Sequence, residues 1–166
     1  ESIKTDVYQA IGAAYVQAIR SIERVQAGKK FVTTSGEEIE IDDIESKYIV
    51  CVTAENFGLI PSEIQDYIEI NDSIGTPYVV NIYDLDIITK ECESYEELIQ
   101  YIEFRKKNYD IISTLDELDA FGFFKKNGNI TISIDADELM LTDFTAEFDK
   151  KYKEEDKKVF QEFFGR

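Results

Sequence analysis

The sequence predicts an α/β fold over residues 1–166: a small mixed or parallel sheet flanked by helices, with a helix-rich C-terminal half. Three features predict it: a long amphipathic stretch near the start, two short apolar runs around a helix signal, and two helix-capping patterns in the second half. A chain of 166 residues with 43% hydrophobic residues can bury one core. We expect a single domain. The chain begins at Glu1, inside a helical pattern, so we also expect a larger parent protein.

The first element is predicted to be a helix over about residues 4 to 27, ended by Gly28. Its apolar residues recur every three or four positions, which is the period of an amphipathic helix. They are Val7, Ile11, Ala14, Ala18, Ile22 and Val25. Residues 31–33 and 39–41 then flank Thr34-Ser35-Gly36, which predicts a small hairpin with a glycine-containing turn.

Residues 48–53 and 78–83 are continuous apolar runs, as expected for strands that are buried on both faces. Between them, Pro61 fits the first turn of a helix that continues to about Asn71. A strand, a helix and a strand indicate a crossover unit, which is right-handed if the strands are parallel. The pattern leaves open whether the two strands are adjacent.

The second half is predicted to be mostly helical. Residues 94–97 (SYEE) and 114–117 (TLDE) fit the capping box that starts a helix, and residues 127–129 (NGN) end the second of these helices. Residues 130–134 alternate between apolar and polar, which predicts a half-buried strand. A late helix is indicated by aromatic residues at four-residue spacing: Phe144, Phe148 and Tyr152.

The net charge of −17 narrows the possible partners. Nucleic acids and anionic membranes would be repelled overall, so direct nucleic-acid binding by this chain is not expected. The charge favours a solvated acidic surface, a basic partner protein or mimicry of a nucleic acid. No apolar run approaches the roughly 18 residues that span a membrane, so no membrane partner is expected.

Cysteine and histidine usage narrows the chemistry. Cys51 and Cys92 are far apart in the sequence and suggest no disulfide framework, so we expect a reducing, cytoplasmic setting. Cys51 lies in an apolar run and is predicted to be a small buried side chain. The chain has no histidine, which excludes histidine-based zinc sites and catalytic triads within it.

Two acidic stretches are candidates for cation sites. Residues 37–43 (EEIEIDD) supply oxygen ligands. A calcium loop wraps its ligands around a tight turn, however, and part of this stretch is predicted to be a strand. Residues 135–138 (DADE) begin like a calcium loop, which then fails because Leu139 takes the third ligand position and no glycine follows. The simpler interpretation of both is ordinary surface charge.

A third pattern, Glu45-Ser46-Lys47, would place a carboxylate and a lysine on one side of a strand, where they could hold a divalent metal. Asp42 and Asp43 are too close along the chain to add the further carboxylate from a neighbouring strand. Residues 155–157 (EDK) repeat the pattern in a charged helical context. A complete small enzyme using Glu45, Lys47 and magnesium is therefore a weak hypothesis, and we predict no catalytic, cofactor-binding or metal-binding residue in this chain.

Three later segments carry a family resemblance: residues 77–86 (PYVVNIYDLD), 101–105 (YIEFR) and 116–123 (DELDAFGF). Together they resemble the C-terminal part of bacterial restriction-endonuclease-like proteins of the PD-(D/E)XK type, close to the nuclease-related domain group. In that family an apolar strand ends in Asp-Leu-Asp or Asp-Leu-Glu. A helix ending near Tyr-Leu-x-x-Arg and an Asp-Glu-Leu-Asp-x-x-Gly segment follow. The likeness covers about residues 8 to 126.

The resemblance implies a nuclease-like parent protein, with a divalent metal possible there. The family's catalytic Asp and Glu-x-Lys lie upstream of the helix that residues 4–27 resemble, so no catalytic carboxylate is carried over to this chain. Gln17 matches a polar residue beside the family's active site, and it also fits the exposed side of an amphipathic helix. The resemblance predicts a non-catalytic part that packs against or regulates a catalytic half. The other hypothesis is an acidic protein-interaction domain of a defence or regulatory system.

Charge also predicts a salt effect on stability. The 35 acidic residues outnumber the 18 basic ones and repel one another in the compact state, and salt screens this repulsion over about 10 Å at about 0.1 M. The melting temperature should therefore rise from low to moderate sodium chloride. Magnesium or calcium chloride at equal ionic strength should raise it further only if carboxylates form a cation site. Thermal melts in the three salts measure both effects, and a Tm that falls with added salt would contradict the repulsion.

Overall fold

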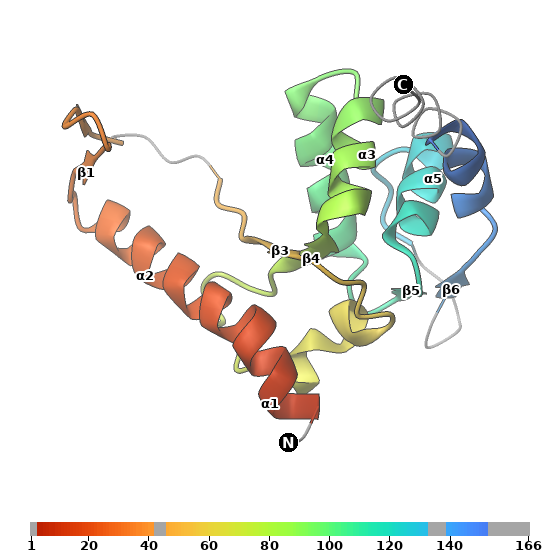
Figure 1. Ribbon diagram of the computed structural model, residues 1–166, viewed down its shortest axis with the longest axis horizontal. Helices are drawn as coiled ribbons and strands as arrows, with labels where there is room; N and C mark the ends of the chain where they lie inside the picture. The colour runs from red at the N-terminus through yellow and green to blue at the C-terminus, as the bar shows by residue number, and fades with distance from the viewer. Residues whose placement is uncertain (1–2, 42–45, 133–138, 153–166) are drawn as a thin grey trace, which may run out of the picture. The chain divides into compact units, whose positions relative to one another are not determined.

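The computed structural model describes residues 3–41, 46–132 and 139–152 (Figure 1). It confirms the α/β class: helices combine with small sheets of two strands, one of them antiparallel and one parallel. The strand pairs are β1 with β2, β3 with β4, and β5 with β6. None of the helices in the described part of the chain is both long and apolar enough to cross a membrane.

The chain folds as two compact units. Unit 1 comprises residues 1–51 and 64–79, and unit 2 comprises residues 52–63 and 80–166. Each unit is therefore built from two separate stretches of sequence, and β3 and β4 each contribute residues to both units. The single domain expected from the sequence stays a prediction.

Unit 1 begins with the predicted helix, in three consecutive parts: α1 (Ile3–Val7), the π-helical turn η1 (Tyr8–Gly12) and α2 (Ala13–Gln26). The helix ends before Gly28, whose φ of 67° lies in the region that glycine adopts easily. Its buried side is anchored by Tyr15, which is 1% exposed. The Tyr15 hydroxyl donates to the carbonyl of Gly75 at 2.7 Å and accepts from the amide of Asn71 at 3.1 Å.

The predicted hairpin is confirmed. β1 (Phe31–Val32) and β2 (Glu38–Ile39) pair antiparallel, and all residues of both strands are exposed. The turn between them contains Gly36 with a φ of 85°, which explains why a glycine stands there.

The two apolar runs form the paired strands β3 (Val50–Thr53) and β4 (Tyr78–Asn81), so the strands are adjacent. β4 is largely buried, but β3 alternates between exposed and buried residues, and the prediction that it is buried on both faces is wrong. Cys51 on β3 is buried, as predicted. The predicted helix to Asn71 is also wrong, because a 3-10 helix, η2 (Ile60–Asp66), replaces it and is interrupted at Glu63.

Unit 2 contains α3 (Ile82–Glu91), which begins inside the run predicted as strand 78–83. The strand stops because the Asn81 side chain accepts hydrogen bonds from the amides of Tyr83 and Asp84 and so starts a helix. The motif at residues 84–86 therefore lies on a helix and not at a strand end. This corrects the prediction for that segment.

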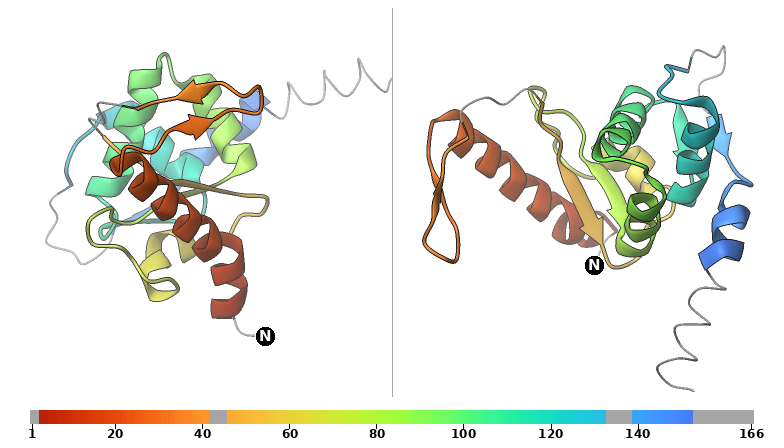
Figure 2. Two further views of the ribbon diagram at one scale, coloured as in Figure 1. Left: turned by 90° about the vertical axis from the view of Figure 1, so that its left-hand side faces the viewer. Right: turned by 90° about the horizontal axis from the view of Figure 1, so that it is seen from above.

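Two further helices follow. α4 (Tyr95–Lys107) begins at the predicted cap, where Ser94 Oγ accepts from the amide of Glu97 at 3.2 Å. α5 (Glu117–Asn127) is preceded by the short strand β5 (Ile112–Thr114), which the sequence did not predict. The cap of α5 is Asp116, because Thr114 is still part of β5, so the capping box predicted at Thr114 is wrong. α5 packs against both α3 and α4 (Figure 2).

The last described elements are β6 (Leu139–Leu141), parallel to β5, and a helical segment over residues 145–152 that confirms the predicted late helix. Residues 130–132 are not a strand, and the remainder of that predicted strand lies outside the described residues. The core of unit 2 is an aromatic cluster in which neighbouring ring centres lie 5.0 to 6.3 Å apart. Its main members are Tyr101, Phe104, Phe121 and Phe124.

Candidate functional site

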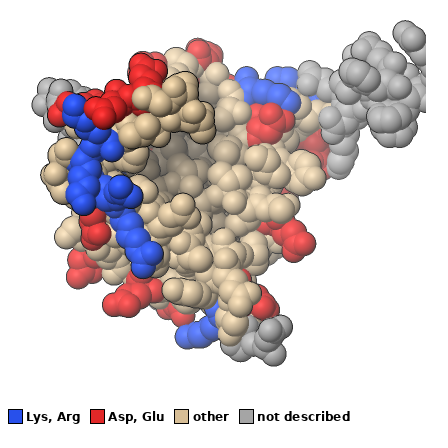
Figure 3. Space-filling model, turned by 60° about the vertical axis from the view of Figure 1, so that its left-hand side comes forward, with Lys and Arg blue, Asp and Glu red and all other residues tan. Residues whose placement is uncertain are grey.

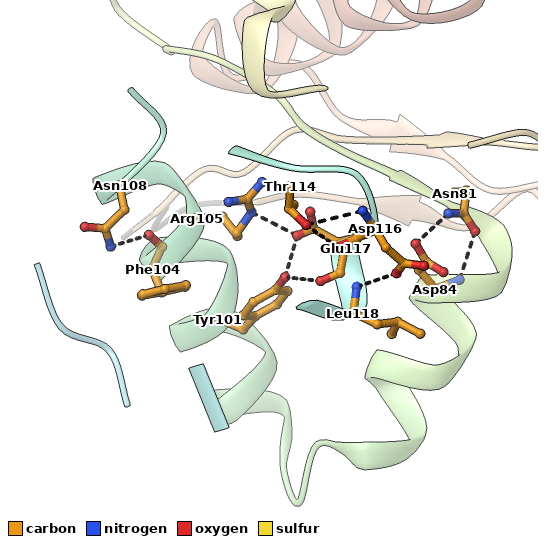
Figure 4. A network of polar contacts seen from close by, with 10 residues as sticks. All are labelled: Asn81, Asp84, Tyr101, Phe104, Arg105, Asn108, Thr114, Asp116, Glu117 and Leu118. Atoms are coloured by element: carbon orange, nitrogen blue, oxygen red, sulfur yellow. Dashed lines mark hydrogen bonds and ion pairs between the residues drawn. The ribbon is translucent and has the colours of Figure 1, made fainter. Parts of the chain in front are cut away.

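Unit 2 places several charged and polar side chains in its interior (Figure 4). Burying such groups is costly unless they find partners, so their arrangement indicates a structural or functional purpose. We call six side chains from β4, α3, α4, α5 and the cap of α5 the acidic network; four of them are buried, and Asn81 and Asp116 are half-buried. The six are Asn81, Asp84, Tyr101, Arg105, Asp116 and Glu117.

The first half of the network is an ion pair between α4 and α5. Arg105 Nε lies 2.9 Å from Glu117 Oε1, and the two side chains are only 9% and 8% exposed. Tyr101 lies one turn before Arg105 on α4, and its hydroxyl donates to the same carboxylate oxygen. Glu117 thus neutralises a buried cation and accepts from a buried hydroxyl, which ties the start of α5 to the middle of α4.

The second half of the network is a pair of carboxyl groups at the starts of α3 and α5. Asp84 is 8% exposed, and its Oδ2 accepts from Asn81 Nδ2 at 2.6 Å. Burial and the nearby carboxylate of Asp116 raise the pKa of Asp84 from 3.8 to about 7, although Asn81 and the backbone of Glu117 donate hydrogen bonds to it. Burial likewise raises the pKa of Asp116. The geometry therefore creates a carboxyl group that exchanges its proton near neutral pH.

A neighbouring carboxylate, Asp119, holds the late helix. Its Oδ1 accepts from the amides of Phe144 and Thr145 at 2.8 and 2.7 Å, so it caps the helical segment 145–152. One turn further along α5, Gly122 faces Phe144, and an added Cβ would lie 2.5 Å from the Phe144 Cβ. Asp119 thus caps this helix, and Gly122 allows Phe144 to approach α5 closely.

Gly122→Ala should lower the free energy of unfolding by about 1–3 kcal/mol, the usual cost of overpacking. The loss is expected even though alanine favours a helix by up to about 1 kcal/mol over glycine, because Phe144 must move away. Urea unfolding followed by circular dichroism measures the effect. Lys126→Ala, at an exposed position on the same helix, is the control and should change stability by less than about 0.5 kcal/mol. A stabilising Gly122→Ala would contradict the close contact.

The candidate residues from the sequence do not meet in this network. The described residues of the stretch 37–43 belong largely to the exposed hairpin, where Lys30 Nζ lies 3.3 Å from Glu38 and 3.5 Å from Glu40. Lys47 is half-buried and Gln17 is exposed on α2. The other candidate carboxylates lie outside the described residues: Asp42, Asp43, Glu45, the carboxylates of residues 135–138, and those of 155–157. Within the described ranges, no group of three or more Cys, Asp or Glu is placed to hold a metal ion.

Sequence reasoning missed the acidic network, yet its residues come from the segments that carry the family resemblance. Asp84 belongs to 77–86, Tyr101 and Arg105 to 101–105, and Glu117 to 116–123. The fold brings these three separate segments together in one buried cluster (Figure 4). No protein-family model, curated protein or solved structure matches the chain.

Proposed function

We propose that this chain is the non-catalytic C-terminal part of a nuclease-like protein of the PD-(D/E)XK type, and that it packs against a catalytic half in the cytoplasm. The observation that carries the proposal is the convergence of the three resembling segments in the acidic network. The contacts of Arg105 and Tyr101 with Glu117, and the proximity of Asp84 to Asp116, link α3, α4 and the start of α5.

The chemistry of the network favours a scaffold over an active site. Arg105 and Tyr101 both contact the Glu117 carboxylate inside the core, whereas a substrate site needs polar groups that face an accessible cavity. Contacts of this kind between buried polar side chains favour one arrangement of the helices that carry them. The proposed role is therefore to keep a rigid body on which the catalytic half rests.

Unit 1 provides a surface for that contact. A cavity of about 260 Å³ lies between η1, the start of α2 and residues 68–71, and its wall includes Tyr8, which is 50% exposed, and Ile19. α2 is amphipathic, yet Tyr15 is its only fully buried residue among those described. An apolar helix face of this kind usually packs against another element. We propose that an apolar side chain of the catalytic half enters this cavity.

The parent gene supplies the first test. An upstream segment with an Asp and a Glu-x-Lys on predicted strands is expected, and its absence would remove the nuclease proposal. The second test co-expresses the tagged upstream half with this chain. Ile19→Asp should reduce co-purification by at least about tenfold, since a buried carboxylate costs several kcal/mol. Ser21→Asp adds the same charge on the opposite side of α2 and should retain the complex. Equal loss in both variants would contradict the proposed surface.

The net charge of −17 favours a second candidate: an acidic domain without enzymatic activity that binds a basic partner protein. Affinity capture at low and high salt addresses it, because an electrostatic complex weakens as salt screens the charges. If no partner is retained even at low salt, electrostatic docking loses its support.

A further inference from the structure

One part of this acidic chain is basic. Residues 7–36 contain Arg20, Arg24, Lys29 and Lys30 but a single acidic residue, Glu23, whereas the whole chain carries a net charge of −17. The positive charge of this stretch lies on α2 and just beyond its end. Lys30 is occupied in ion pairs with the hairpin, which leaves three cations to consider.

These three cations, Arg20, Arg24 and Lys29, form what we call the basic stripe. All three are exposed, and no ion pair is found for them among the described residues. Figure 3 brings forward the side that holds α2 and shows Lys and Arg side chains gathered along one line. Arg20 and Arg24 are one turn apart, or about 6 Å along the axis at 1.5 Å per residue. Their neighbours on this side of the helix, Gln17 and Ser21, are exposed and uncharged.

The position of the stripe on α2 separates it from the apolar side of the helix. At 100° per residue, Arg20 and Arg24 point away from the side that carries Tyr15, Ile19 and Ile22. Those three residues are buried or half-buried, whereas the two arginines are exposed. A partner on the stripe therefore leaves the apolar side free for the contact proposed above.

We infer that the basic stripe binds the phosphate backbone of a nucleic acid without reading its sequence. Arginine presents a planar fork of donors that matches phosphate oxygens, and lysine adds a point charge. The stripe offers only the charged donors of arginine and lysine, which suit phosphate oxygens, so backbone contacts are expected. The overall negative charge of the chain repels a nucleic acid. At about 0.1 M salt, however, screening limits this repulsion to a range of about 10 Å, so the charges nearest to the phosphates dominate. The inference does not depend on the catalytic half.

The test measures binding of the full chain to a short fluorescein-labelled DNA duplex by anisotropy. Three phosphate contacts predict that affinity falls by roughly 40-fold between about 50 mM and about 200 mM salt. Arg20→Gln, Arg24→Gln and Lys29→Gln together should weaken binding by at least about tenfold and flatten the salt dependence. The matched control, Lys107→Gln with Lys126→Gln and Lys150→Gln, removes the same charge from exposed positions in unit 2 and should leave affinity within about threefold.

Three results would overturn the inference. The first is no binding at about 50 mM salt. The second is an equal loss in the stripe and control variants, which would show a general charge effect. The third is tighter binding to phosphatidylserine vesicles or to polyglutamate than to DNA, which would assign the stripe to a membrane surface or an acidic protein. Circular dichroism of each variant checks that the fold is intact, so that loss of binding reports on the stripe itself.

Discussion

Arg105→Leu should lower the free energy of unfolding by about 3–5 kcal/mol, because it leaves Glu117 charged and buried without its cation. The remaining hydroxyl of Tyr101 donates one hydrogen bond to that carboxylate but does not balance its charge. Urea unfolding at neutral pH, followed by circular dichroism, gives the free energy from the midpoint and slope. The same loss would loosen the contact between α4 and the start of α5.

The double variant Arg105→Leu with Glu117→Leu should recover much of this loss, since an apolar pair of similar volume often replaces a buried ion pair at little cost. The exposed pair of Lys90 and Asp86, 2.6 Å apart on α3, is the control. Lys90→Leu should cost less than about 1 kcal/mol, as is usual for surface pairs. If Arg105→Leu cost no more than Lys90→Leu, the ion pair would not be the anchor that the geometry indicates.

Stability should fall as the pH rises from about 4 to about 7, because of Asp84. Its pKa is raised from 3.8 to about 7 in the folded protein, so the folded state holds a proton that the unfolded state has already released. The stabilisation is complete below the unfolded pKa and is lost as the pH passes the folded one. A shift of this size corresponds to about 4 kcal/mol, at about 1.4 kcal/mol per pKa unit.

Asp84→Asn removes the titrating group while keeping an oxygen to accept from Asn81. It should flatten the stability profile over this pH range and make the protein more stable than the unmodified chain at pH about 8. Urea unfolding at a series of pH values measures both effects. Asp86→Asn, exposed on the same helix, is the matched control and should leave the slope nearly unchanged. A slope that survives Asp84→Asn would assign the effect to other carboxylates.

The sequence predicted correctly those elements of the fold that depend on a strong local signal. The period of the first helix, the hairpin glycine Gly36 and the cap at Ser94 each depend on neighbouring residues only, and the structure confirms them. α3 was missed because the apolar run of β4 continues through Ile82 and Tyr83, although Asn81 three residues before Asp84 is itself a helix-start pattern. β5 and β6, with three residues each, are too short to show a period.

The acidic network could not be predicted, because its pairs are formed by the fold. Arg105 and Glu117 are twelve positions apart on different helices, and each alone is indistinguishable from a surface charge. The raised pKa of Asp84 needs burial and the neighbouring Asp116, which stands 32 residues away. The resembling motifs pointed to these segments but not to their contacts. The net charge of −17 for the whole chain likewise gives no sign of the basic residues that gather on one side of α2.

The division of the chain has a practical consequence for how it can be cut. Each unit is assembled from two stretches, and the backbone passes from one unit to the other three times, after residues 51, 63 and 79. A fragment that starts at residue 80 would lack residues 52–63, and with them the bond from Asn56 Nδ2 to the carbonyl of Leu115. No single cut of the chain therefore separates the two units. A cut after residue 51 divides unit 1, a cut after residue 63 divides both units, and a cut after residue 79 divides unit 2.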